Sequence, residues 1–484
     1  MNYKMMGRFT AQMLLIEGLF LLPALLISLW LGERAAVHGF LITLGLIALA
    51  GGPVYFFCRD AKSAFYATDG MVCVAVSWLV LSLVGAIPFY VSRAIPAYID
   101  AVFETVSGFT TTGASILPEV ESMAKGLLYW RSFTHWVGGM GVLVFLLAIA
   151  PSKGSEQGFT MHLLRAESPG PSVGKLVPKM RKTAGILYML YIALTVVNFV
   201  LLLIGGMPVL DALCTAFGTA GTGGFGIKND SLASYSPYIQ NVTTVFMLLF
   251  GVNFSCYYFL TQRQLKTVLR DEELRLYVLI VLGSIGLIVW NLWGFYPTFE
   301  ETLRHAAFQV GSIITTTGYA TTDFDLWPSF SKTILLCLMV VGACAGSTGG
   351  GIKVARVLIL FKSLKRNIAQ MLHPRKVQSI RNNGAVVSER VVANTNAYLC
   401  AYVVILFVSF MLISLDGYSV GTNFSAVLSC LNNIGPGLEL VGPTCSFSVF
   451  GTLSKLVLIL DMLLGRLEIF PILVLFSVQS WKNA

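Results

Sequence analysis

Apolar runs of about 20 residues, the length that crosses a bilayer as a helix, recur along most of the 484-residue chain. Two such runs, Phe9–Leu31 and His38–Cys58, predict an opening hairpin of membrane helices. After them one pattern occurs four times: an apolar span, a short helix, a polar loop and a returning span. The first spans are predicted at Met71–Ser92, Thr183–Gly205, Leu274–Phe295 and Ala393–Leu415, and the returning spans at Leu128–Pro151, Pro237–Thr261, from Ser331 onward and at Phe450–Val478.

The short helices of this pattern are too short to cross a membrane. They are predicted over Asp100–Phe109, from Leu210, over Glu301–Ile313 and over Val420–Leu431. Each runs into a loop of glycines and hydroxyl or amide residues, a sequence whose backbone lipid cannot satisfy. Such a loop must be buried in protein or line water, and the negative end of each short helix would point at it.

The pattern predicts an all-α polytopic membrane protein with ten full spans and four half-helices. Four pseudo-symmetric repeats would surround one pore, beside the N-terminal hairpin. The predicted units are 1–62 for the hairpin, then 63–182, 183–273, 274–389 and 390–484 for pore repeats one to four.

The four loops align on one glycine each, at Gly113, Gly223, Gly318 and Gly435, with intervals of 110, 95 and 117 residues. Glycine lets a carbonyl turn toward an axis without a Cβ clash, and rings of carbonyl oxygens can replace the water around K⁺. Close helix packing through small residues is the alternative explanation, but it does not account for four loops in register. The candidate ion-binding residues are Thr111, Thr112, Gly113, Gly221, Thr222, Gly223, Thr316, Thr317, Gly318, Asn433, Ile434 and Gly435.

Composition and charge agree with a membrane protein. The chain is 56% hydrophobic and 12% charged, and its mean hydropathy is +0.75. The formal net charge of +9 fits basic cytoplasmic segments, which set the orientation of membrane helices. Because no basic segment is interleaved with stacking aromatics, we expect no nucleic-acid partner. Both termini are predicted to be cytoplasmic, as are the segments with Lys153, Arg165, Lys175, Lys179, Arg181 and Lys182, with Arg263 to Arg275, and with Lys362 to Arg390.

The returning span of repeat three contains the glycine-rich sequence GACAGSTGGGIK, Gly342–Lys353. Each glycine destabilises a helix by about 1 kcal/mol relative to alanine, so this span should break inside the membrane. A phosphate-binding loop is the competing interpretation, but Ile352 separates the glycines from Lys353 and no strand precedes them. Arg466 lies within the last predicted span, where a charge indicates a functional site. A local pair of Arg466 with Glu468 or Asp461 is the alternative.

The four loops, the third of which reads TTTGYA, together with Gly342–Lys353 and WRSFTHWVGGMG at Trp130–Gly141, resemble the TrkH/KtrB superfamily of K⁺ uptake proteins, and most of all its TrkH branch. The resemblance covers essentially the whole chain. It implies a homodimer in the bacterial inner membrane, a cytosolic TrkA-type ring that senses nucleotide, and an intramembrane gate. His135 stands where this family is expected to have glutamine. The gate residues implied are Gly346, Ser347, Thr348, Gly349, Gly350, Gly351 and Arg466.

These observations predict passive K⁺ uptake through a pore, with lipid around it and K⁺ as the transported ion. A secondary transporter that couples K⁺ to H⁺ or Na⁺ is the alternative, because broken membrane helices suit transporters too. A membrane enzyme would need a catalytic cluster within the spans, and the sequence shows none. The histidines, cysteines and carboxylates lack metal-site spacing, so we expect no cofactor.

Overall fold

The computed structural model of the chain describes residues 2–59, 67–139, 141, 180–375, 378–478 and 481. The regular secondary structure of the described part consists of helices and one small antiparallel hairpin, β1 (Arg381–Asn382) and β2 (Ala385–Val386). The end of the first predicted returning span lies outside the described residues, as does the basic segment with Lys153, Arg165, Lys175 and Lys179.

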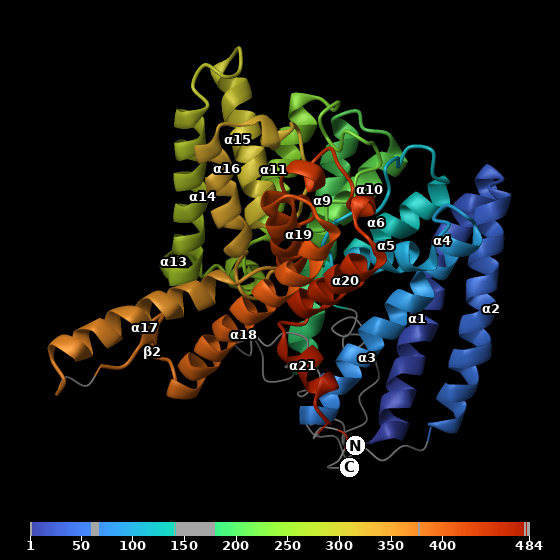
Figure 1. The fold of residues 1–484 in the computed structure, drawn as a ribbon, viewed down its shortest axis with the longest axis horizontal. Coiled ribbons are helices and arrows are strands. Elements are labelled where there is room, and N and C mark those ends of the chain that lie inside the picture. Colours follow the sequence, from blue (N-terminus) through green and yellow to red (C-terminus); the bar gives the residue numbers. More distant parts are fainter. Residues whose placement is uncertain are drawn as a thin grey trace.

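The predicted opening hairpin is present as α1 (Tyr3–Leu31) and α2 (Arg34–Phe57). Gly32 ends α1 with φ of 70°, a left-handed conformation that glycine adopts without a Cβ penalty. The two helices run side by side at one edge of the molecule (Figure 1). The rings of Tyr3 and Trp481 stack with their centroids 6.4 Å apart, so the described beginning and end of the chain lie together.

Long apolar helices begin the four repeats. They are α3 (Ala67–Gly85) with its continuation α4 (Ile87–Val91), α9 (Met180–Ile204), α14 (Glu272–Asn291) and α18 (Glu389–Ile413), followed by a 3₁₀ turn η2 (Ser414–Asp416). With α1 and α2, these make six candidate membrane spans among the described residues. Many of their apolar side chains are exposed, as Leu279 and Met411 are, which fits a surface that faces lipid. The prediction of an all-α polytopic membrane protein is confirmed.

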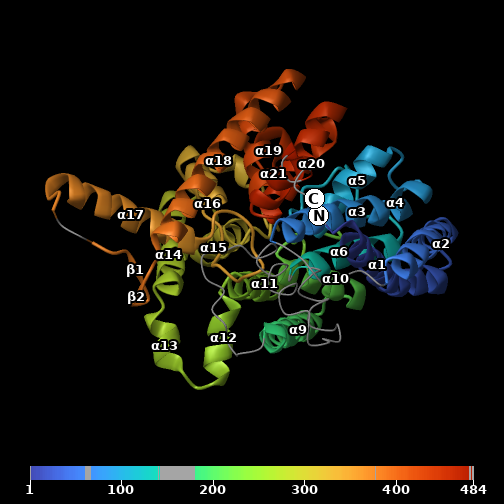
Figure 2. The ribbon, with the colours of Figure 1, turned by 90° about the horizontal axis from the view of Figure 1, so that it is seen from below.

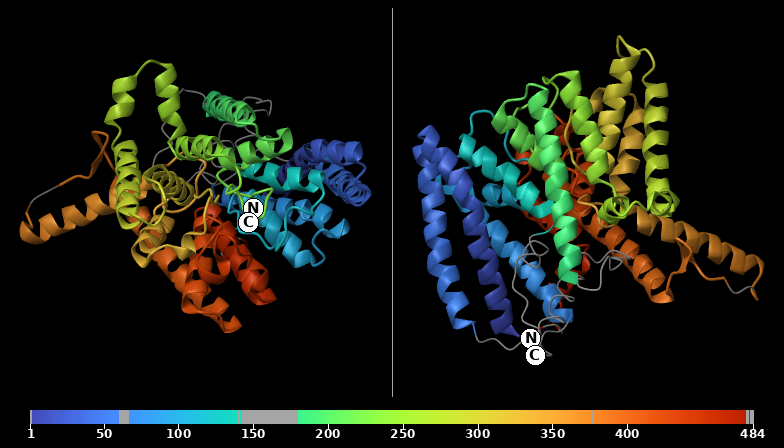
Figure 3. Two further views of the ribbon diagram at one scale, coloured as in Figure 1. Left: turned by 90° about the horizontal axis from the view of Figure 1, so that it is seen from above. Right: turned by 180° about the vertical axis from the view of Figure 1, so that it is seen from behind.

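The four predicted half-helices are also present, as α5 (Tyr98–Phe109), α10 (Val209–Gly221), α15 (Phe299–Ile314) and α19 (Val420–Asn432). Side-chain caps fix two of their starts: Thr298 accepts a hydrogen bond from Glu301 N at 3.2 Å, and Ser419 accepts one from Thr422 N at 3.1 Å. Viewed from above or from below, the four repeats follow one another around a common centre in chain order (Figure 3, left; Figure 2).

The returning segments differ from the prediction. Only the third was expected to break, yet those of repeats two, three and four are all interrupted. In repeat two, α11 (Pro237–Phe250) and α12 (Phe254–Thr261) meet at an angle of 91°. In repeat three, α16 (Ser329–Val340) and α17 (Val354–Leu372) flank the segment 341–353, and in repeat four α20 (Thr452–Arg466) and α21 (Phe470–Phe476) are separate helices. The predictions of continuous spans at Pro237–Thr261 and Phe450–Val478 are therefore wrong.

The remaining elements connect these helices. They are α13 (Leu265–Arg270) and the 3₁₀ turns η1 (Phe324–Leu326), η3 (Glu439–Val441) and η4 (Phe447–Val449), while α6 (Lys125–Gly139) is the described part of the first returning span. Helix α17 runs sideways, across the direction of α14, and carries the small β hairpin beside it (Figure 1). Its exposed side chains mix apolar residues such as Phe361 and Met371 with basic ones such as Lys365.

Candidate functional site

The four half-helices end in the same way. In each, one residue donates its N–H to the carbonyl three residues back, and the next residue donates to the carbonyl five residues back, as Thr111 and Thr112 do at 3.1 and 2.9 Å. This is the Schellman pattern, which satisfies helix carbonyls that would otherwise lack a partner. The first residue of each pair is left-handed: Thr111, Thr222, Thr316 and Asn433, with φ of 55°, 55°, 58° and 56°.

A left-handed threonine is a backbone outlier, because its branched Cβ clashes with the neighbouring peptide. Each such residue raises the energy of the fold by about 1–3 kcal/mol, and persists only where its surroundings impose it. The same left-handed conformation at one position in four separate loops, on threonine in three of them, indicates that the loops share a required shape.

The backbone also corrects the register of the second loop. Two residues after each left-handed threonine or asparagine stands a glycine with positive φ, and in loop two this is Gly224 rather than Gly223. Gly221, predicted as a loop residue, is the last residue of α10. Because Gly223 and Gly224 are consecutive in TGGFG, the sequence alone could not show which of them aligns with the ring glycines of the other loops. The equivalent triplets are Thr111–Gly113, Thr222–Gly224, Thr316–Gly318 and Asn433–Gly435.

These triplets form a closed ring. A Cβ added to Gly113 would overlap the carbonyl oxygen of Gly223 in loop two. A Cβ on Gly224 would likewise overlap Thr317 O in loop three, and one on Gly318 would overlap Ile434 O in loop four. The ring closes at Gly435, whose added Cβ would lie 2.9 Å from Thr112 O in loop one. Each glycine thus packs against the middle carbonyl of the next loop, and the four middle carbonyls belong to one layer.

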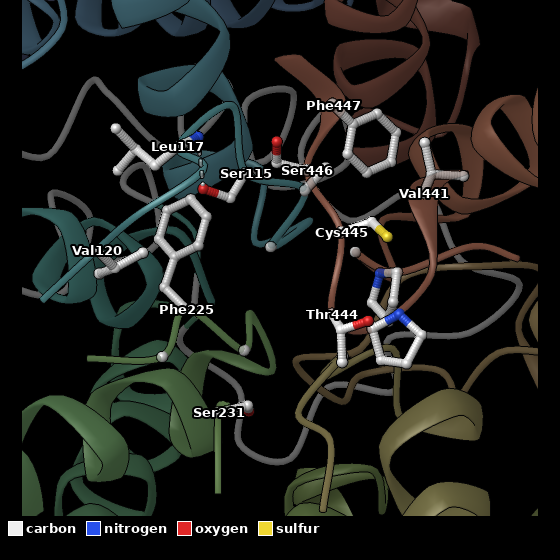
Figure 4. A pocket seen from close by; sticks show the side chains of 18 of the residues that line it. Ser115, Leu117, Val120, Phe225, Ser231, Val441, Thr444, Cys445, Ser446 and Phe447 are labelled. Atoms are coloured by element: carbon white, nitrogen blue, oxygen red, sulfur yellow. Dashed lines mark hydrogen bonds between the residues drawn. The ribbon is translucent and has the colours of Figure 1, made fainter. Parts of the chain in front are cut away.

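A cavity of about 380 Å³ opens on one side of this ring (Figure 4). All four ring glycines, Gly224 among them, belong to its lining. The rest of the lining comes from residues that follow the ring glycines of loops one and two, from the segment after loop four with Cys445 and Phe447, and from Arg131 of α6. The cavity therefore leads to the ring from outside the helix bundle.

The segment 341–353 contacts the ring from its other side. Gly350 N donates to Thr316 Oγ1 at 2.6 Å, and a Cβ on Gly349 would lie 2.9 Å from Thr315 O. The segment folds back on itself through a parallel bridge between Val341 and Ile352. As predicted from its glycines, it is not helical.

The broken helix of repeat two supports this segment. Cys344 N donates to Gly251 O at 3.0 Å, and Phe254 N donates to Gly346 O at 3.1 Å, both at the bend between α11 and α12. The backbone at the bend between α11 and α12 and the backbone of the segment 341–353 thus provide hydrogen-bond partners for each other. Irregular backbone inside a membrane requires such partners.

Two cationic side chains bind carbonyl oxygens of the segment. Arg466 donates through Nη1 to Thr348 O at 2.9 Å, and through Nη2 to Gly139 O at 2.7 Å and to Gly138 O. It also reaches Thr111 Oγ1 at 3.3 Å, in loop one. Lys353, which is 9% exposed, donates to Gly349 O. The structure thus places Arg466 between the segment, loop one and the end of α6.

The local pair considered for Arg466 is not formed. Glu468 pairs with Arg356, whose guanidinium lies 4.0 Å from the centroid of the Tyr398 ring, and Asp461 accepts from Ser409 Oγ at 2.7 Å. Sequence reasoning missed the Arg356–Glu468 pair, which joins the start of α17 to the break after α20. The positive φ values of Glu468 and Ile469, 54° and 71°, mark that break.

His135 has partners that the sequence did not reveal. Phe225 N donates to its Nε2 at 3.3 Å, so Nε2 is an acceptor and the ring proton must lie on Nδ1. Nδ1 then donates to Gly108 O at 2.9 Å, in the last turn of α5. The imidazole therefore bridges half-helix one and loop two as a neutral group. His305 Nε2 lies 3.9 Å from Glu301 Oε1, and His305 Nδ1 forms a hydrogen bond of 2.9 Å with Thr321 Oγ1.

Among the described residues, no three histidine, cysteine or carboxylate side chains are grouped so that they could hold a metal ion. The shared chemistry at the ring is that of uncharged oxygens, from carbonyls and hydroxyls, with half-helix C-termini directed at it. Such oxygens suit a cation that is bound weakly and released again. Fold and site together define a class: an integral membrane transport protein built as four repeats around a ring of loops.

Comparison with known proteins gives the family. The model of the TrkH family, described as cation transport protein, matches residues 36–483. The Trk system potassium uptake protein TrkH of Salmonella typhimurium is 36% identical over 97% of both chains, and TrkG of Escherichia coli is 34% identical over 97% of this chain and 96% of its own. The crystal structure of the potassium transporter TrkH from Vibrio parahaemolyticus has a TM-score of 0.89 at 31% identity, covering 99% of this chain and 100% of that one. The chain belongs to the TrkH family of cation transport proteins.

Proposed function

We propose that this protein is a K⁺ uptake pore of the bacterial inner membrane. K⁺ enters down its electrochemical gradient, drawn by the inside-negative potential, which is worth about 2.3 kcal/mol per charge per 100 mV. Relatives that match almost the full length of the chain are named Trk system potassium uptake proteins, which supports this substrate.

The observation that carries the proposal is the closed ring of four loops. K⁺ that sheds its water needs several oxygens at once, and four loops in contact can offer them in successive layers. The middle layer consists of the carbonyls of Thr112, Gly223, Thr317 and Ile434, each packed against a glycine of the preceding loop. The proposed selectivity filter comprises Thr111 to Gly113, Thr222 to Gly224, Thr316 to Gly318 and Asn433 to Gly435.

Gly346 to Gly351 act as the gate. This segment touches the ring on the side away from the cavity, where K⁺ would leave. Arg466 and Lys353 bind its carbonyls, so two positive charges stand on the exit path. Opening then requires the hydrogen bond between Gly350 N and Thr316 to break. At least one of the two side chains, Arg466 or Lys353, must also release the carbonyl that it binds.

The assembly proposed here follows the family resemblance. The protein forms a homodimer, with both termini cytoplasmic, and binds a cytosolic TrkA-type ring that senses nucleotide. The exposed basic residues of α17 and the segment that follows it, such as Lys365 and Arg375, offer a surface for such a partner. Lipid surrounds the long helices, and the repeats divide at residues 62, 182, 273 and 389.

Currents through the purified protein in a planar bilayer test the proposal against its alternative. With a K⁺ gradient, a pore gives currents that reverse at the K⁺ equilibrium potential at every pH and Na⁺ concentration. A reversal potential that moves with pH or with Na⁺ would instead indicate K⁺/H⁺ or K⁺/Na⁺ symport. If the chain alone carries no current, the same measurement is made with the nucleotide-binding ring added.

A further inference from the structure

A buried ion pair lies beside the ring, on the side of the cavity. Glu104 is on half-helix α5 and Arg131 is on α6, and they are 1% and 3% exposed. Arg131 Nε and Glu104 Oε1 are 2.5 Å apart. A guanidinium in the lining of a cation pathway is unexpected, because it would repel the ion that must pass.

The guanidinium uses each of its three nitrogens for a different partner. Nε binds Glu104, Nη1 donates to Gly226 O at 2.9 Å, and Nη2 donates to Ser115 Oγ at 3.1 Å. Ser115 and Gly226 are equivalent positions: each stands two residues after the ring glycine of its loop, Gly113 or Gly224. One rigid, planar side chain therefore spans the junction between loops one and two at matching points.

Glu104 and Phe225 complete the cluster. The carboxylate accepts from Ile116 N at 2.8 Å and from Ser115 Oγ at 3.0 Å, so it holds loop one as well as Arg131. The guanidinium carbon lies 3.5 Å from the centroid of the Phe225 ring, which belongs to loop two. Hydrogen bonds that involve an ionised partner are about twice as strong as neutral ones, and several here share one cluster.

Other junctions of the ring are joined by the backbone. Between loops two and three, Leu232 N donates to Ala320 O at 3.0 Å, and between loops four and one, Phe447 N donates to Ser115 O at 2.8 Å. At the junction of loops one and two, the ionised side chain of Arg131 provides this link instead.

We propose that Arg131 is a positioning residue that determines selectivity, and that Glu104 holds it and cancels its charge. The side chain sets the spacing of loops one and two, and with it the separation of the carbonyl oxygens of Thr112 and Gly223 in the ring. A looser junction lets those oxygens approach the smaller Na⁺. This inference rests on the proposed function, since it concerns the selectivity of that same ring.

Two substitutions separate geometry from charge. Arg131→Lys keeps the positive charge but cannot reach Glu104, Ser115 and Gly226 at once. It should lower the preference for K⁺ over Na⁺ by about tenfold, the effect of losing one hydrogen bond to a charged group, while flux continues. Glu104→Gln leaves the charge of Arg131 uncompensated, so the rates for K⁺ and Na⁺ should fall together.

The preference is measured as competition of K⁺ and Na⁺ against ⁸⁶Rb⁺ uptake into liposomes that hold the full-length protein. Arg366→Lys is the matched control, because Arg366 pairs with Glu389 at 2.5 Å between α17 and the start of α18, away from the ring. It should keep the wild-type ratio. An Arg131→Lys protein with the wild-type ratio overturns the inference. Wild-type protein that takes up ⁸⁶Rb⁺ without preferring K⁺ would instead contradict the proposed function.

If either single variant fails to fold, the double variant Glu104→Gln/Arg131→Gln replaces it. Removing both charges of a buried pair destabilises a protein much less than removing one. The double variant should show uptake with a lowered K⁺ preference, and a wild-type ratio in that protein would equally overturn the inference.

Discussion

The backbone N–H of Gly350 donates a hydrogen bond of 2.6 Å to the hydroxyl oxygen of Thr316. Thr316 is the left-handed residue of loop three, and Gly350 belongs to the interrupted helix beneath it. One hydrogen bond thus joins the proposed filter to the proposed gate. The two parts, 34 residues apart in sequence, are in direct contact.

Removing that hydroxyl should favour the open gate. Thr316→Val keeps the branched shape and the backbone strain but leaves Gly350 N–H without its acceptor, which costs the closed state about 1–3 kcal/mol. We expect more ⁸⁶Rb⁺ uptake by the chain alone, without the cytosolic partner.

The control for this variant is Thr222→Val, at the equivalent position of loop two. The Thr222 hydroxyl donates to Gly221 O at 2.6 Å, within its own loop. Uptake should therefore stay near the wild-type rate in the control. Equal changes in both variants would show that the hydroxyl of Thr316 acts on the loop and not on the gate.

Lysine at position 466 should not replace arginine in holding the gate segment closed. Its two terminal nitrogens reach carbonyls of the gate segment and of α6, a fork that one ammonium cannot reproduce. Arg466→Lys should raise the uptake of K⁺ without the partner, since the closed segment loses part of its support. Uptake at or below the wild-type level would contradict a role for Arg466 in holding the gate closed.

Much of this arrangement could be predicted from the sequence. Glycine and threonine loops after short apolar helices gave the half-helices to within a few residues, because polar backbone inside a membrane has few permitted places. The gate segment was equally visible, since its glycines exclude a helix. Arg466 was identified as a charge within the last predicted span, the resemblance assigned it to the gate, and the structure brings it to loop one and the gate segment.

The rest depends on contacts between segments far apart in sequence. Gly251 to Asn253 lie in an apolar run, and their bend is explained by hydrogen bonds to the gate segment 93 residues later. The register of loop two could be assigned only from φ values, because the sequence alone does not distinguish Gly223 from Gly224 as the ring glycine. The Glu104–Arg131 pair was missed because the two residues come from different helices.

Cys445 offers a chemical test of the cavity. Its side chain is exposed and belongs to the cavity lining (Figure 4). A methanethiosulfonate that carries a quaternary ammonium should attach a positive charge there and reduce K⁺ uptake by wild-type protein. Cys445→Ser should be insensitive, although the thiols of Cys337 and Cys400 are also exposed. Equal inhibition of both proteins would place the reactive thiol elsewhere.

Glu439 should make stability depend on pH under acidic conditions. It lies in η3, outside the spans, and the hydroxyls of Ser419 and Thr422 donate to its carboxylate, which lowers its pKa below the ordinary value. The stabilisation is complete above the unfolded pKa of about 4.3 and is lost as the pH falls through the lower, folded value.

Glu439→Gln should therefore lower the Tm at pH 7, and its difference from wild type should shrink below about pH 4. Thermal unfolding of the detergent-solubilised protein across this range measures the effect. Glu119→Gln, at an exposed carboxylate, should give no such difference. A constant difference between Glu439→Gln and wild type at every pH would mean that the carboxylate charge is not the cause.

The most direct test of the ring compares two glycines of repeat three that have nearly the same backbone. Gly318 and Gly294 have φ of 83° and 80°, so alanine strains the chain similarly at either position. A Cβ on Gly318 would overlap Ile434 O in the next loop, whereas a Cβ on Gly294 would meet no atom within 4 Å.

The measurement is the ratio at which K⁺ and Na⁺ compete with ⁸⁶Rb⁺ for uptake into liposomes. A filter formed by the closed ring predicts that Gly318→Ala loses about tenfold in K⁺ preference, equivalent to roughly 1.4 kcal/mol, while Gly294→Ala keeps the wild-type ratio. The same ratio in both variants, with uptake intact, would show that the contact between Gly318 and Ile434 does not set selectivity and would contradict the four-loop filter.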